Sequence, residues 1–415
     1  MPYHALKRRP LGGLSEFRRF LYNAFILPWR SPKLAYLYSA SLLFAFSFSF
    51  LDLFIVIDLI ELSAWDMAAY LISKSVGVSA LVSLLFIMIT RHGGRVIYPV
   101  MTAMMMGALM YAIMDQNGLT ALELGIIFAL TNSSFWALYH VFFAISISNE
   151  NVGNEVSLAG TGMTLGMAIG YFCGGLFQAL SFETLGMMIG FGGMVIATFM
   201  LIIHAYRLRL KRLLRQSGAL DETLKEAFLR CKYRSLGAPF DAAMQIGGGT
   251  LWLAYLSLSG IGAIAVGIWS TLMVLVKIIF TPIAGSLINH GKRREMLMGS
   301  AVTSIGWLPF IFTPVLALPA MYIWSVGNQL FQSGLNSAWY QTRTVSSLLA
   351  REIILGSARL ILTPLMVWLL YTDANYFIYF MLGAAILMVL YSLYWMRNIK
   401  IKGPGMPIET LVARR

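Results

Sequence analysis

Among the ionisable side chains inside long apolar stretches of this sequence, five are the first candidates for chemistry: Asp52, Lys74, Asp241, Lys277 and Arg359. A charge in hydrocarbon is costly, so it usually faces an opposite charge or a water-filled cavity. Asp52 and Lys74 each lie about eight residues from the outer end of neighbouring stretches, or ~12 Å deep at ~1.5 Å per helical residue. We expect these two to pair, and Asp241 and Lys277 to form a second depth-matched pair nearer the inside.

Most of these residues, and His140 of another stretch, have two interpretations each. The pair of Asp52 and Lys74 can fix the rotation of two helices, or Asp52 can accept a coupling proton or cation while Lys74 tunes its proton affinity. Asp241 can also lie in the aqueous interface. Arg359 has no acidic partner in its own stretch, which suits an anionic ligand group, although pairing with Asp52 or a backbone carbonyl explains it equally well. His140 can relay protons near neutral pH or be a satisfied histidine at an inner helix end.

A polar run interrupts the apolar stretch that holds Asp241. It consists of Gln245 followed by Gly247, Gly248 and Gly249. A glycine-interrupted membrane helix can mark a binding site. It can equally be a kink that helps packing, and the sequence leaves both interpretations open.

Two other stretches, 119–146 and 317–342, carry the most polar and aromatic side chains. Asn328, Gln332, Asn336 and Trp339 recur at helical spacing and share one face. A polar stripe must avoid lipid, so we expect it to line a cavity, although an interfacial aromatic belt would explain Trp339 and Tyr340. The candidate cavity residues are Asn132, Trp136, His140, Gln245, Asn328, Gln332, Asn336, Trp339, Tyr340, Arg343 and Arg359.

The elements that must position these residues are apolar helices. Of 415 residues, 58% are hydrophobic and only 12% charged, against about 25% charged in soluble proteins. Most apolar stretches approach or exceed the roughly 20 residues that cross a bilayer as a helix, the form that satisfies its own backbone groups in lipid. The stretches lie at 36–60, 66–90, 97–114, 119–146, 156–180, 184–206, 237–259, 261–286, 296–314, 317–342, 350–371 and 374–396. We therefore predict an all-α polytopic membrane protein with twelve transmembrane helices.

Basic residues set the expected orientation. Only Lys74, Lys277 and Arg359 escape the two tails and the even-numbered connections, so the positive-inside rule places both termini in the cytoplasm. The net charge of +13 is then explained by anionic lipid headgroups, and nucleic acid is not expected as a partner. The two cysteines, in a span and in an inner connection, imply no disulfide framework. The basic N-terminus lacks the apolar stretch and cleavage site of a signal peptide.

The longest inner connection divides the chain into two halves. An amphipathic helix at 13–30 can lie on the inner interface of the membrane. The expected parts are a cytoplasmic segment over 1–35, a six-helix bundle over 36–206, a cytoplasmic linker over 207–236, a second six-helix bundle over 237–397 and a cytoplasmic tail over 398–415.

The halves carry matching motifs. Arg91, Gly93 and Arg95 follow the second stretch, and a similar loop follows the eighth. With its two halves of six spans, the chain resembles the major facilitator superfamily of secondary transporters, which carries G-x-x-x-D-R-x-G-R-R in the first of these loops and an echo in the second. Both aspartates are replaced here, by Thr90 and Asn289. The resemblance implies a gating loop motif made of Arg91, Gly93, Arg95, Gly285, Asn289, Arg293 and Arg294.

The fifth stretch carries Gly166, Gly170, Gly174 and Gly175. Glycines four residues apart let another helix approach closely. The spacing resembles the family's G-x-x-x-G-P-x-x-G-G, with Tyr171 in place of proline. The family associates the fuller motif with proton-coupled export, and close packing alone also explains the glycines.

The sequence holds no nucleotide-binding loop, no H-E-x-x-H and no paired-cysteine metal motif, so we expect no cofactor, no metal and no enzyme activity. The resemblance implies two pseudo-symmetric six-helix bundles that move a small organic solute, amphipathic or anionic, by alternating access. We expect a monomer in the bacterial cytoplasmic (inner) membrane, with protons as a hypothetical coupling ion through Asp52. Two alternatives stay open: a flippase for lipids or lipid-linked molecules on the same fold, and a non-transporting membrane scaffold or sensor.

Overall fold

The computed structural model describes residues 32–60, 63–92, 94–114, 119–146, 152–289, 294–311, 317–340, 342 and 344–398. Within these ranges the regular elements are all helices. The interfacial helix expected at 13–30 lies outside the described residues, as do the two ends of the chain.

Six helices form the first half: α2 (Pro32–Leu59), α3 (Ala64–Arg91), α4 (Gly94–Met114), α5 (Ala121–Ser146), α6 (Val152–Ala179) and α7 (Glu183–Arg207). Two short helices follow, α8 (Leu210–Gln216) and α9 (Leu224–Ser235). The second half contains α10 (Ala238–Gln245), the π-helix η2 (Ile246–Thr250), α11 (Leu251–Leu258), α12 (Ala263–Asn289), α13 (Arg294–Trp307), the 3-10 helix η3 (Leu308–Ile311), α14 (Ala317–Tyr340), α15 (Val345–Thr372) and α16 (Ala374–Asn398).

These elements confirm the predicted fold class. Among the described residues, eight helices are long and apolar enough to cross a membrane by length and composition. The other four predicted spans correspond to α4, the broken segment α10–η2–α11, α13 with η3, and the polar-striped α14. The π-helix breaks the segment α10–η2–α11, and polar side chains interrupt α14.

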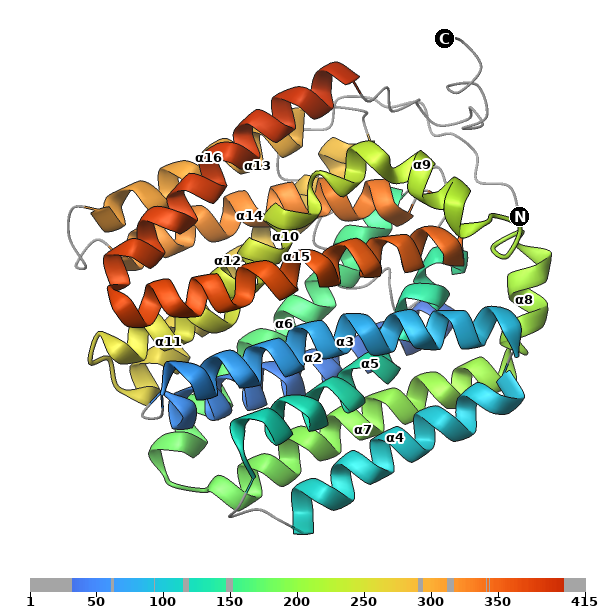
Figure 1. The fold of residues 1–415 in the computed structure, drawn as a ribbon, viewed down its shortest axis with the longest axis horizontal. Helices are drawn as coiled ribbons and strands as arrows, with labels where there is room; N and C mark the ends of the chain where they lie inside the picture. Colours follow the sequence, from blue (N-terminus) through green and yellow to red (C-terminus); the bar gives the residue numbers. More distant parts are fainter. Residues whose placement is uncertain are drawn as a thin grey trace, which may run out of the picture.

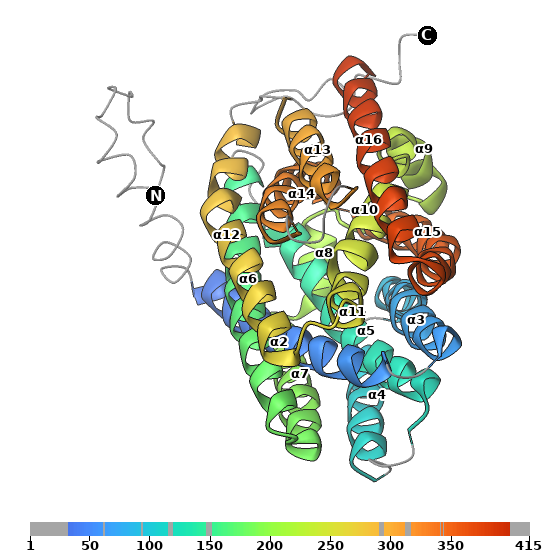
Figure 2. The ribbon, with the colours of Figure 1, turned by 90° about the vertical axis from the view of Figure 1, so that its left-hand side faces the viewer.

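The two halves lie against each other along two helix pairs. In both ribbon views, α12 lies beside α6 and α15 beside α3 (Figures 1 and 2), and these are the main packing contacts between the halves. Aromatic side chains fill the core of each half. In the first half the rings of Phe44 and Phe135 stack at 3.7 Å between centroids, and in the second half Trp307 and Trp324 stack at 5.2 Å.

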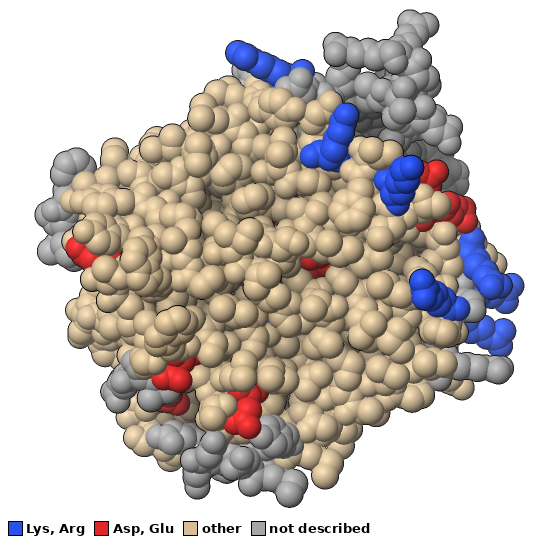
Figure 3. Space-filling view, viewed as in Figure 1, with Lys and Arg blue, Asp and Glu red and all other residues tan. Residues whose placement is uncertain are grey.

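Basic surface residues lie at one end of the molecule. Figure 3 shows Lys and Arg gathered at the end that carries α8 and α9, and a group of Asp and Glu at the opposite end, with an almost uncharged band between them. Such a band is what a hydrocarbon layer requires.

Glycines of α6 let two neighbouring helices come close. A Cβ atom added at Gly166 or Gly170 would lie 2.3 Å from a backbone carbonyl oxygen of α2, and one at Gly174 would lie 2.9 Å from another. Gly175 instead faces α12, where its added Cβ would lie 3.0 Å from the Cα atom of Gly267. These glycines therefore serve close packing within the first half and between the halves.

The segment between the halves is docked on the second half. The Glu222 carboxylate accepts a hydrogen bond from Ser347 Oγ at 2.9 Å, at the start of α15, and forms an ion pair with Arg230 at 2.7 Å. Thr223 caps α9, and its backbone N–H lowers the pKa of the Glu226 carboxyl. The connection is thus held to α15 by buried polar contacts.

Candidate functional site

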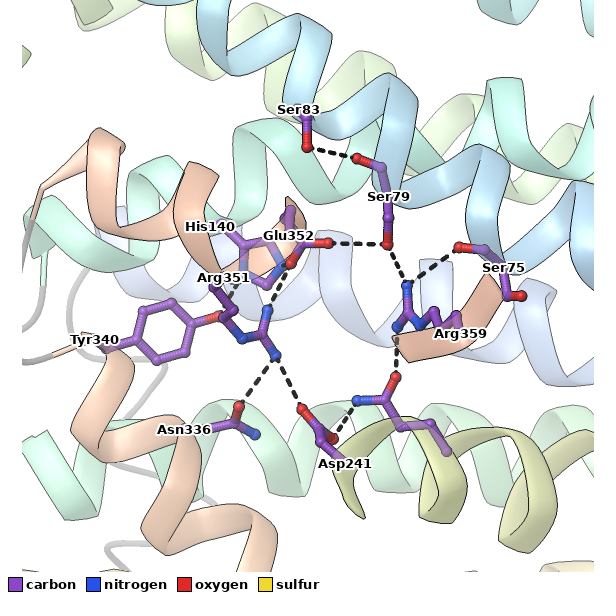
Figure 4. A network of polar contacts seen from close by, with 11 residues as sticks. Ser75, Ser79, Ser83, His140, Asp241, Asn336, Tyr340, Arg351, Glu352 and Arg359 are labelled. Atoms are coloured by element: carbon purple, nitrogen blue, oxygen red, sulfur yellow. Dashed lines mark hydrogen bonds and ion pairs between the residues drawn. The ribbon is translucent and has the colours of Figure 1, made fainter. Parts of the chain in front are cut away.

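A closed ring of six polar side chains joins the two halves (Figure 4). We call it the polar ring. Its members are Ser79 of α3, Asp241 and Gln245 of α10, and Arg351, Glu352 and Arg359 of α15.

One side of the polar ring consists of charged partners. Arg351 NH1 donates to Glu352 Oε1 at 2.8 Å, and Arg351 NH2 lies 3.7 Å from Asp241 Oδ2. The other carboxylate oxygen of Asp241 accepts a hydrogen bond from Gln245 Nε2 at 2.6 Å. Arg351 is therefore compensated by two carboxylates, as a buried guanidinium requires.

The other side of the polar ring is built around Arg359, and its partners are neutral. Arg359 NH2 donates to Gln245 Oε1 at 2.6 Å, and NH1 donates to Ser79 Oγ at 2.7 Å and to the Ser75 backbone oxygen at 3.3 Å. The Ser79 hydroxyl in turn donates to Glu352 Oε2 at 3.5 Å, which closes the ring. No carboxylate lies within ion-pair distance of Arg359 among the described residues.

Four further side chains attach to the polar ring, two of them through His140. His140 of α5 forms a hydrogen bond of 2.5 Å between Nδ1 and the Tyr340 hydroxyl, and its Nε2 lies 4.0 Å from Glu352 Oε1. Asn336 Oδ1 accepts from Arg351 NH2 at 3.3 Å. Trp136 stacks on His140 with 5.2 Å between ring centroids. The site thus joins α3 and α5 of the first half to α10, α14 and α15 of the second.

The spacing on α15 explains how the ring closes. Glu352, Gly356 and Arg359 lie at i, i+4 and i+7 and therefore share one helix face. A Cβ atom at Gly356 would lie 2.8 Å from the Cβ of Ser79. The glycine lets α3 approach α15. Ser79 therefore reaches Glu352 and Arg359, which lie on either side of Gly356.

A second polar group, the Asp52 cluster, consists of Asp52 of α2, Lys74 of α3 and Thr250 at the end of η2. Lys74 Nζ forms an ion pair with Asp52 Oδ1 and lies 3.4 Å from Thr250 Oγ1. The Thr250 hydroxyl donates to Asp52 Oδ2 at 2.9 Å. Lys74 and Asp52 are only 6% and 2% exposed, so the pair is shielded from solvent. Its contacts with Thr250 join the first half to the second.

The π-helix connects the two polar groups. Gln245 immediately precedes η2 and Thr250 ends it, so one five-residue element separates the polar ring from the Asp52 cluster. A Cβ atom at Gly247 would lie 2.4 Å from Met381 Sδ, and one at Gly248 would lie 2.8 Å from the Trp324 ring. Short π-helical segments inside α-helices are frequent at functional sites, and here the glycines make room for the wider turn.

Seven of the predicted site residues meet at the polar ring or attach to it: Trp136, His140, Asp241, Gln245, Asn336, Tyr340 and Arg359. Of the two partners weighed for Arg359, the structure places a backbone carbonyl against it and keeps Asp52 with Lys74.

The expected pairing of Asp241 with Lys277 is wrong. Asp241 contacts Arg351 and Gln245, whereas Lys277 Nζ lies 5.8 Å from the centroid of the Trp324 ring. Among the described residues no acidic group lies within ion-pair distance of Lys277. The depths expected from the sequence matched the two residues, but the structure gives them different neighbours.

Four residues of the two polar groups were not predicted from the sequence: Arg351, Glu352, Ser79 and Thr250. Arg351 was counted with the basic residues of the inner connection, because it stands at the start of a predicted span. The signal for Glu352 was its helical spacing from Arg359, which places these two residues on one face. Serine and threonine carry no such signal, since they are common in apolar helices.

Several other predicted residues lie away from the polar ring. Asn132 Oδ1, Asn328 Oδ1 and Gln332 Nε2 are buried and have no hydrogen-bond partner among the described residues. Trp339 is buried in the core.

The gating loop motif lies largely beyond what the structure describes. Arg91 is exposed at the end of α3, and a Cβ at Gly285 would lie 2.3 Å from Ser157 Oγ of α6. Outside the described residues or side chains lie Gly93, Arg95, Asn289, Arg293, Arg294 and the cavity candidate Arg343. Within the described part of the chain, no three His, Cys, Asp or Glu residues gather as a metal site would require.

No family model and no curated protein matches this sequence. Solved structures do match it over most of its length. The xylose transporter XylE from E. coli, in a partially occluded inward-open conformation, has a TM-score of 0.64 at 15% identity, covering 89% of this chain and 98% of its own.

Two other solved structures give similar values. An outward-facing bacterial homologue of the iron transporter ferroportin has a TM-score of 0.63 at 17% identity, covering 88% of this chain and 99% of its own. The human organic anion transporter MFSD10 (TETRAN) has a TM-score of 0.63 at 11% identity, covering 87% of this chain and 100% of its own. At these identities the likeness establishes the arrangement of the helices.

Proposed function

Because this chain has the fold of major facilitator superfamily transporters, we propose that it is a secondary transporter for a small organic solute that carries an anionic group. The observation that carries this proposal is Arg359, whose guanidinium lies between the halves with neutral partners only. A carboxylate or phosphate can replace Gln245 or Ser79 against Arg359 and form stronger, charge-assisted hydrogen bonds. The planar guanidinium also suits bidentate recognition of such a group.

The polar ring offers a direct route from binding to alternating access. Its bonds from Arg359 to Ser75 and Ser79 join the second half to the first, and so does the contact of His140 with Tyr340. A ligand that binds Arg359 in place of Ser75 and Ser79 weakens the link that these two residues form between the halves. Because a ligand shifts a conformational equilibrium only through differential contacts, this exchange supplies the difference that rocking of the halves requires.

Proton coupling through Asp52 is the second part of the proposal. Asp52 holds Lys74 and accepts from Thr250 across the boundary between the halves. Protonation of this carboxylate removes the charge that holds Lys74 and loosens the link. Asp52→Asn is expected to abolish gradient-driven uptake or efflux in proteoliposomes. Transport that follows the proton gradient as well in this variant as in the wild type would reject the coupling role.

We also propose the orientation given by the basic residues. The end that carries α8 and α9 then faces the cytoplasm, together with both ends of the chain, in a bacterial cytoplasmic membrane. The anionic headgroups of that leaflet attract the Lys and Arg residues gathered there (Figure 3).

Ligand-dependent stabilisation of the purified protein tests the substrate class. Organic carboxylates and phosphates, neutral sugars and organic cations are compared by their effect on the melting temperature, because a ligand that binds the native state raises it. We expect a subset of the anions to stabilise the wild type and Arg359→Gln to lose roughly 10-fold or more in affinity, about 1.4 kcal/mol.

Lys277→Gln is the matched control, since Lys277 is a second cation within a span but lies against Trp324. It is expected to keep the response to anions. Retention of the full response by Arg359→Gln, or stabilisation by neutral sugars alone, would contradict an anionic substrate.

A further inference from the structure

The ammonium group of Lys74 lies among three aromatic rings. Its Nζ is 4.6 Å from the ring centroid of Phe128, 5.0 Å from that of Phe48 and 5.2 Å from that of Tyr70. These rings come from α5, α2 and α3. The Asp52 carboxylate and the Thr250 hydroxyl complete the surroundings of the nitrogen.

This composition matches the chemistry that recognises a free organic cation. A cation over an aromatic face is attracted by the quadrupole of the ring, and cages of such rings bind quaternary and methylated ammonium groups. A carboxylate supplies the opposite charge, and a hydroxyl supplies an acceptor. All five groups surround the nitrogen of Lys74 and not its carbon chain. An ammonium group that is not attached to the protein can therefore make the same contacts.

We propose that Asp52, Thr250 and the rings of Phe48, Tyr70 and Phe128 form a binding site for a single organic ammonium group, which Lys74 occupies as a tethered ligand. The site differs from the polar ring, where guanidinium groups meet carboxylates, amides and hydroxyls. The inference does not depend on which solute the protein transports. It assigns to Lys74 the role of keeping α2, α3 and η2 together from inside a cation site.

Lys277 provides the comparison within the same molecule. Its Nζ lies 5.8 Å from the centroid of one ring, Trp324, and no carboxylate of the described residues pairs with it. Removal of Lys277 therefore leaves no cage, whereas removal of Lys74 leaves a carboxylate, a hydroxyl and three rings around an unfilled space.

The test uses the full-length protein in detergent. Lys74→Ala is titrated with methylammonium chloride and tetramethylammonium chloride while its melting temperature is measured, with sodium chloride added to hold the ionic strength constant. We expect a saturable rise in the melting temperature of Lys74→Ala. We expect no rise in the wild type, whose site is filled, in Lys277→Ala, or in Asp52→Asn/Lys74→Ala. Phe128→Leu in the Lys74→Ala background should weaken the response.

Three outcomes would overturn the proposal. One is a flat titration of Lys74→Ala with both ammonium salts. Another is an equal rise in the wild type or in Asp52→Asn/Lys74→Ala, which would place the amines elsewhere. The third is failure to recover folded Lys74→Ala even when methylammonium is present throughout extraction, because a site that accepts the free amine would restore that variant.

Discussion

The Asp52 cluster and the polar ring both join the two halves of the protein, but they treat buried cations differently. In the Asp52 cluster one ammonium meets one carboxylate and aromatic walls surround it. In the polar ring two guanidinium groups share two carboxylates unequally, so that Arg351 takes both and Arg359 takes neither. A cation that is already compensated has little to gain from a solute. A cation held by neutral groups gains a full opposite charge from an anionic solute. Ligand binding is therefore expected at Arg359.

The largest effect is expected from breaking the compensated pair. Lys74→Met should lower the free energy of unfolding by about 3–5 kcal/mol, because it leaves the Asp52 carboxylate buried without a partner. Asp52→Asn/Lys74→Met removes both charges and should recover most of that loss. Denaturant unfolding of both variants in detergent, with no amine present, measures the difference. A single variant within about 1 kcal/mol of the wild type would show that the pair behaves like an exposed one.

A smaller effect with two opposite signs is expected at Glu352. Glu352→Gln should lower the free energy of unfolding by about 1.5–3 kcal/mol, because it removes a charged hydrogen-bond partner of Arg351. The same change leaves Arg351 with Asp241 alone, at 3.7 Å, and makes it resemble Arg359. Affinity for an anionic ligand should therefore rise. Thermal unfolding and ligand titration of one preparation read both quantities, and weaker anion binding would count against the comparison.

The π-helix lies between the two polar groups, so its distortion should disturb both. Gly248→Ala places a Cβ 2.8 Å from the Trp324 ring and should destabilise the protein by about 1–3 kcal/mol through overpacking. Gly249→Ala is the matched control, since nothing lies within 4 Å of its added Cβ, and it should change stability by no more than about 1 kcal/mol. Equal losses in the two variants would mean that glycine flexibility, not close packing, is needed.

The smallest effect is expected from the neutral partners of Arg359. Ser79→Ala removes the hydroxyl that accepts from Arg359 and donates to Glu352, and should cost about 1 kcal/mol of stability. The Ser83 hydroxyl donates only to a backbone oxygen of its own helix, so Ser83→Ala should cost less. Thermal unfolding of the two variants compares them. A larger loss in Ser83→Ala would remove Ser79 from the link between the halves.

Much of the fold could be predicted from the sequence, because in a membrane the surroundings of a residue depend mainly on its depth in the bilayer. Apolar runs of sufficient length must cross it as helices. The predicted spans therefore correspond to the observed helices, including the broken one over α10, η2 and α11. For the same reason the sequence singled out charges that stand inside spans, and four of the five lie in the polar ring or the Asp52 cluster.

The partners of those charges were decided only by tertiary structure. Depth is readable from the sequence, but contact also depends on the rotation of each helix and on which helices are neighbours. Asp241 and Lys277 were matched by predicted depth but have different partners, while Gly356 brings Ser79 of the other half against Arg359. The sequence by itself determined the class of protein, its spans and five of the charges within them, but not Arg351 and Glu352. Packing across the two halves decided which cation is compensated and which remains available to a solute.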